Sequence, residues 1–117
     1  MLFRVDPSSS VPLVEQISGN VRQHLVNGTI TTGDRLPAAR ELADSLGVNM
    51  HTVLKAYAAL RDEGLLELRR GRGAVITATH PADSARMSAA LREVADAARR
   101  MGLGADDVVQ LVRKALP

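Results

Sequence analysis

Residues 40–65 read RELADSLGVNMHTVLKAYAALRDEGL, and this stretch decides the fold of the chain. A short amphipathic helix is expected over about residues 39–46. Gly47 ends it at a tight turn, because glycine adopts backbone angles that are unfavourable for other residues. A longer helix is expected from about Met50, with Asn49 as its N-cap. Its inward positions are Val53, Ala56, Tyr57 and Leu60. These spacings predict a helix-turn-helix, whose second helix presents its first residues to base edges in the DNA major groove.

A basic, glycine-rich hairpin follows the motif. LLELRR (65–70) and GAVIT (73–77) predict two short strands joined across GRG (71–73), with Arg69, Arg70 and Arg72 as the densest basic cluster of the chain. Beside a recognition helix, such a wing can reach the neighbouring minor groove, where narrow A·T-rich DNA attracts arginine. Two other interpretations stay open at this point: a solvated hairpin tip without a role, and a nuclear targeting patch.

The flanking segments predict three further helices. One begins near Pro12 and ends at Asn27-Gly28. After a linker over residues 79–84, a fourth helix carries apolar residues at alternating spacings of four and three, a period that suits a helix–helix seam. The fifth runs from Asp106 to Lys114. The seam residues are Met87, Leu91, Val94, Ala98 and Met101, and the apolar face of the last helix includes Leu111 and Val112.

The predicted fold is therefore mainly α with a small β-hairpin. A winged helix-turn-helix DNA-binding domain is expected over residues 1–79, and a two-helix dimerisation tail over residues 80–117. That tail is too short to fold alone.

Composition narrows the function. The chain has 117 residues, no cysteine and only two aromatic residues, which argues against disulfides and against base-stacking platforms. No apolar run approaches the roughly 20 residues that span a bilayer, and the N-terminus lacks the apolar core of a signal peptide, so a cytoplasmic protein is expected. The net charge of +2 alone does not indicate DNA binding, but all basic residues except Lys55 and Lys114 are arginine.

Catalytic and metal-binding patterns are missing from the sequence. His24, His51 and His80 lack metal-ligand spacing, and neither a nucleophile elbow nor a phosphate-binding glycine loop occurs. We expect no enzymatic activity, no metal and no cofactor.

The stretch Gly33–Ile76, with its LP..REL, GV, TV, EGL and RRGRG elements, resembles the winged helix-turn-helix domain of the GntR family of bacterial transcription regulators. PLVEQI, MHTVLKAY and the short helical tail resemble the YtrA subfamily. The resemblance assigns DNA contacts to Arg40, Asn49, Met50, His51, Thr52, Lys55, Arg70, Gly71 and Arg72.

Two positions depart from the family pattern. Ala38 stands where the family often has a capping Ser, a loss that typically costs ~1 kcal/mol, although Glu41 has the position to bond back toward the helix start. Met50 and His51 stand at base-reading positions where the family often has Asn, Thr or Arg. The operator sequence therefore cannot be inferred from the operators of relatives. Arg40 has an alternative role in a surface pair with Asp44, and His51 has one as an ordinary exposed residue. Tyr57 fits the core better than a stacking role.

The expected function is that of a sequence-specific regulator, a repressor in preference to an activator, that binds an inverted-repeat operator as a homodimer. It would be bacterial and associated with the nucleoid when bound to DNA. Any effector would be a small molecule near the dimer or domain junction. The alternatives are an architectural protein that coats DNA without sequence preference and, less favoured by the residues present, a small enzyme.

Overall fold

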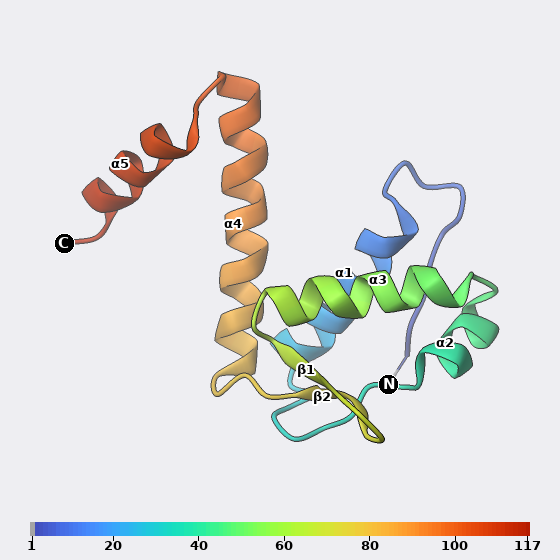
Figure 1. Cartoon of the computed structure of the whole chain (residues 1–117). Helices are drawn as coiled ribbons and strands as arrows, with labels where there is room; N and C mark the ends of the chain where they lie inside the picture. Colours follow the sequence, from blue (N-terminus) through green and yellow to red (C-terminus); the bar gives the residue numbers. More distant parts are fainter. Residues whose placement is uncertain (1) are drawn as a thin grey trace. The chain divides into compact units, whose positions relative to one another are not determined.

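The computed structural model describes residues 2–117, which divide into two compact units, one ending at Arg86 and the other starting at Met87. The first unit contains α1 (Leu13–Val26), α2 (Ala39–Leu46), α3 (Met50–Asp62), β1 (Leu66–Arg69) and β2 (Gly73–Ile76). Helix α4 (Pro81–Met101) begins in the first unit and continues into the second, where α5 (Ala105–Ala115) follows (Figure 1). The predicted order of helices with a single hairpin is confirmed.

The core of the N-terminal unit forms where α1, α3 and the hairpin pack together. Ile17 and Val21 of α1 are fully buried with Val53 and Leu60 of α3, at the spacings that an amphipathic helix requires. Tyr57 is also buried, and its hydroxyl donates a hydrogen bond of 2.7 Å to the carbonyl of Pro37. Tyr57 is thus a core residue, as its spacing predicts.

The hairpin is antiparallel, with Leu66 opposite Ile76 and Leu68 opposite Ala74. A third segment pairs with β2 on the side away from β1: Arg35 bridges to Val75, and the amide of Leu36 donates to the carbonyl of Ala74 at 2.9 Å. From the sequence, no helix or strand is expected in this segment. A strand of one bridge is too short to show alternation, so no periodic signal marks it.

Helix α4 starts earlier than expected, at Pro81 instead of after a linker that reaches residue 84. Proline is tolerated in the first turn of a helix because its missing N–H would have no partner there. Asp83 adds a favourable negative charge to the same turn, and the amide of Ser84 donates to the carbonyl of His80 at 2.8 Å. Ala85 is fully buried in the core of the N-terminal unit.

The C-terminal unit consists of the later turns of α4 and all of α5, joined at Gly102–Gly104. Gly102 adopts a left-handed conformation (φ 70°), and the amide of Leu103 closes the turn on the carbonyl of Ala98 at 2.8 Å. Asp107 caps α5 by accepting from the amide of Gly104 at 3.0 Å. No residue of α5 is buried. Within residues 2–117, none of the helices has the length and apolar character required to cross a membrane.

Candidate nucleic-acid interface

The turn between α2 and α3 has the geometry that the motif predicts. Gly47 ends α2 in a left-handed conformation (φ 69°), where a residue with a Cβ would be strained. Val48 then packs against the core, and its amide donates to the carbonyl of Ala43 at 3.0 Å. These contacts fix the start of α3 relative to α2.

Asn49 is the N-cap of α3, as predicted. Its side-chain carbonyl accepts from the amide of His51 at 2.7 Å, which satisfies one of the free donors of the first turn. The side-chain amide group of Asn49 donates no hydrogen bond within the described residues and is therefore available to an external acceptor.

The predicted base-contacting residues in the first two turns of α3 differ in their exposure to solvent. His51 and Lys55 are exposed, Thr52 is half-buried, and Met50 is half-buried and packed against the core. His51 and Lys55, one turn apart, therefore form the outermost part of this surface. Met50 has both a packing role and a place at the start of the helix.

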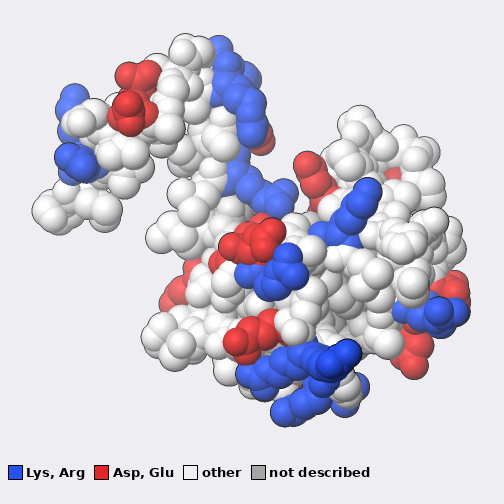
Figure 2. Space-filling model, in the orientation of Figure 1, with Lys and Arg blue, Asp and Glu red and all other residues white. Residues whose placement is uncertain are grey.

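The hairpin tip places two arginines in solvent without an acidic partner. Gly71 and Gly73 are both left-handed (φ 76°), and the amide of Arg72 donates to the carbonyl of Arg69 at 3.0 Å across the turn. Arg69 pairs with Glu67 at 2.7 Å, whereas no described residue pairs with Arg70 or Arg72. Figure 2 shows Lys and Arg side chains gathered over the hairpin region at the lower edge of the molecule.

The pairing of charges separates two groups of cations in the N-terminal unit. The first group forms ion pairs and consists of Arg22 with Glu63, Arg61 with Asp62, Arg69 with Glu67 and Arg86 with Asp83. The second group lacks a side-chain partner among the described residues and consists of Arg4, Arg35, Arg40, Lys55, Arg70 and Arg72. Four of these six were predicted to contact DNA. The alternative pair between Arg40 and Asp44 does not form, and neither Ala38 nor Glu41 caps α2.

Arg35 and Arg22 are relevant residues that sequence reasoning missed. Arg35 is exposed beside the hairpin through its bridge to Val75, and the only sequence signal for it was its position next to the motif. Arg22 is buried, and its Nε donates to Glu63 at 3.0 Å, which ties α1 to the C-cap of the recognition helix α3. A contact between residues so far apart in sequence leaves no local pattern.

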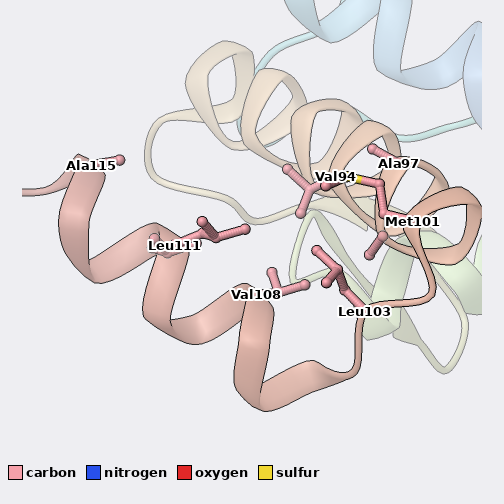
Figure 3. Close-up of a pocket in the computed structure, with 9 residues that line it drawn as sticks. Val94, Ala97, Met101, Leu103, Val108, Leu111 and Ala115 are labelled. Atoms are coloured by element: carbon pink, nitrogen blue, oxygen red, sulfur yellow. The ribbon is translucent and has the colours of Figure 1, made fainter.

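The predicted dimerisation residues lie in the C-terminal unit. Val94, Ala98 and Met101 of α4 share one apolar cleft of about 270 Å³ with Leu111 and Val112 of α5. In Figure 3 the labelled side chains of the two helices point toward one another, and they carry only carbon and sulfur atoms. Leu91 lines an adjoining cleft, and Met87 lines neither of the two.

Comparison with known proteins places this architecture in a family. The model of the bacterial regulatory proteins of the gntR family matches residues 13–76, which run from the start of α1 to the end of the hairpin. The chain belongs to the GntR family. The predicted family, its winged helix-turn-helix fold and its character as a regulator instead of an enzyme are thereby confirmed.

Individual relatives of this GntR protein agree with that assignment. The transcriptional repressor YtrA of Bacillus subtilis is 42% identical over 65% of this chain, and the match spans 58% of the length of that repressor. YtrA of Sulfolobus acidocaldarius, a GntR-family transcription factor, superposes with a TM-score of 0.63 at 32% identity, covering 97% of this chain and 96% of the other. The DNA-binding domain of AraR, solved in complex with operator ORX1, superposes with a TM-score of 0.57 at 29% identity, covering 65% of this chain and 93% of the other.

Proposed function

We propose that this GntR protein is a transcription repressor that binds double-stranded operator DNA as a homodimer. One observation carries the proposal. The exposed first turns of α3 lie next to a hairpin whose arginines Arg70 and Arg72 have no acidic partner among the described residues. Leu54 of α3 and Arg70 of the hairpin line one shared cleft, so the two surfaces are neighbours. A surface with unpaired cations of this kind fits a polyanion.

The two elements divide the work of recognition. Helix α3 lies in the major groove, where Asn49, Met50, His51, Thr52 and Lys55 face the bases. The hairpin enters the adjacent minor groove with Arg70 and Arg72, and Gly71 lets the backbone approach. Arg40 contacts the backbone from α2.

The homodimer is proposed from the apolar surface of the C-terminal unit. Met87, Leu91, Val94 and Met101 are exposed large apolar residues, and α5 adds Leu111 and Val112. Two such helical hairpins can bury each other as a four-helix arrangement with two-fold symmetry. The operator is then an inverted repeat with half-site centres about 10 base pairs apart.

The functional division assigns DNA binding to residues 1–79 and dimerisation to residues 80–117, with Ala85 of α4 also completing the N-terminal core. The protein acts in the bacterial cytoplasm and is associated with the nucleoid when bound to its operator. Any effector that controls it is a small molecule.

The test is a selection of bound fragments from random and genomic DNA at several controlled salt concentrations. The expected result is one enriched inverted repeat, bound with two chains per site. The same selection with a His51→Ala/Lys55→Ala variant, in which two exposed residues of α3 are truncated without touching the core, should lose that enrichment. Equal recovery of all fragments by the wild type would instead favour an architectural protein without sequence preference.

A further inference from the structure

An apolar cleft lies between the recognition helix and the hairpin. This helix–hairpin cleft has a volume of about 320 Å³ and is lined by residues that include Leu54, Tyr57, Leu68 and Arg70. All of its lining residues belong to the N-terminal unit, so its shape is set by one compact body.

Leu54 and Leu68 are left open to solvent at this cleft. Their exposed fractions are 40% and 42%, and neither belongs to the buried core. Leu54 follows His51 on the outer side of α3, and Leu68 lies opposite Ala74 in the hairpin. A single exposed leucine is ordinary, but these two line the same cleft between α3 and the hairpin and form a shared apolar surface there.

The proposed binding of α3 and the hairpin to DNA determines which part of the DNA lies over this cleft. With α3 in a major groove and the hairpin in the adjacent minor groove, one sugar-phosphate strand separates the two elements. That strand alternates anionic phosphates with the apolar edges of deoxyribose. The cleft has the matching chemistry, because its floor is apolar and Arg70, which no described acid neutralises, lies on its lining.

We propose that the helix–hairpin cleft takes the backbone of one DNA strand, with Leu54 and Leu68 against a deoxyribose and Arg70 at the neighbouring phosphate. The proposal rests on the proposed function, and it assigns Leu54 and Leu68 as positioning residues that set the register of helix and hairpin on the duplex. An apolar contact releases no counterions. It therefore contributes to affinity on every sequence and leaves the salt dependence unchanged.

The experiment compares Leu54→Ala, Leu68→Ala and the rescue variant Leu54→Met with the wild type. Each chain is titrated, at a series of salt concentrations, against the selected operator and a random duplex of equal length and composition. Val11→Ala is the matched control, because Val11 is 45% exposed and lies outside the cleft. Thermal unfolding of each variant verifies that the fold is retained.

The expected result is an affinity loss of about three- to tenfold for each alanine variant, equal on both duplexes and with the wild-type salt slope. Leu54→Met and Val11→Ala should bind as the wild type does. A loss confined to the operator, and abolished when a thymine is replaced by uracil, would overturn the proposal in favour of a thymine-methyl contact. Wild-type affinity of both alanine variants would also overturn it.

The failure of this proposal and the failure of the proposed function give different results. If the wild type binds the operator and Arg70→Ala weakens it while the leucine variants have no effect, only the cleft proposal fails. If the wild type binds no duplex at any salt concentration, both fail.

Discussion

The two compact units of the chain differ in what each leaves without a partner. The N-terminal unit encloses its own core, in which Ile17, Val53 and Leu60 are fully buried. Beside the exposed leucines of the helix–hairpin cleft, its surface carries six cations that have no acidic partner among the described residues. In the described C-terminal unit only Ala98 is buried, while Met87, Leu91 and Met101 are each more than half exposed. Unpaired cations fit an anionic partner, and an exposed apolar stripe fits an apolar one. The two surfaces therefore indicate two different classes of partner.

The largest expected effect tests the exposed apolar stripe of the C-terminal unit. Leu91→Asp or Val94→Asp introduces a charge into the proposed seam, and burial of an unpaired charge should split the dimer. Each monomer keeps α3 and the hairpin but loses the second half-site, so affinity for the full operator should fall by about 10²- to 10⁴-fold. Sedimentation and operator titration measure the two effects.

Ala89→Asp is the matched control for that experiment. Ala89 is exposed on α4 but lies on the side of the helix away from the stripe, so the same charge there should leave the dimer intact. A wild-type chain that stays monomeric at micromolar concentration would mean that the exposed stripe serves a different partner.

The next largest effect concerns the recognition of bases by the surface of the N-terminal unit. His51→Ala removes an exposed side chain from the first turn of α3 and should change the preferred base at one position in each half-site, at a cost of ~1–3 kcal/mol. Competition between single-base operator variants measures the change. An equal loss on every duplex would assign His51 to the backbone instead of a base.

A smaller and more uniform effect is expected at the hairpin. Arg70→Ala or Arg72→Ala should weaken binding to all sequences and reduce the salt slope by roughly one unit for each lost phosphate contact. Arg61→Ala is the control, because Arg61 is also on the surface but pairs with Asp62 at 3.3 Å. An unchanged salt slope in the hairpin variants would indicate that the tip is merely solvated.

The sequence predicted the fold well where local signals mark the ends of elements. The end of α2 follows from Gly47 and the start of α3 from the Asn49 cap, and both signals act within a few residues. The bridge of Arg35 to Val75 and the part-buried pair of Arg22 with Glu63 could not be predicted, because both join residues about 40 apart in sequence. The half-burial of Met50 was also missed, since periodicity does not show how far the core extends at a helix end.

The smallest expected effect sharpens the claim that the N-terminal unit has a core of its own. Burial raises the pKa of Tyr57, so the folded chain keeps the phenol proton while the unfolded chain loses it above about pH 10. The contribution of neutral Tyr57 is therefore fully present below that pH. Above it, the free energy of unfolding should fall by up to about 1.4 kcal/mol per pH unit.

Tyr57→Phe tests this expectation. At pH 7 the variant should lose ~1 kcal/mol of stability, because the hydrogen bond to the carbonyl of Pro37 disappears. From pH 10 upward the gap to the wild type should close, since the variant has no phenol to ionise. Urea unfolding at pH 7, 9, 10 and 11 measures both effects. The same convergence in a Leu91→Asp background would show that this core is independent of the tail, whereas parallel pH curves for the wild type and the Tyr57→Phe variant would show that the phenol is not buried in solution.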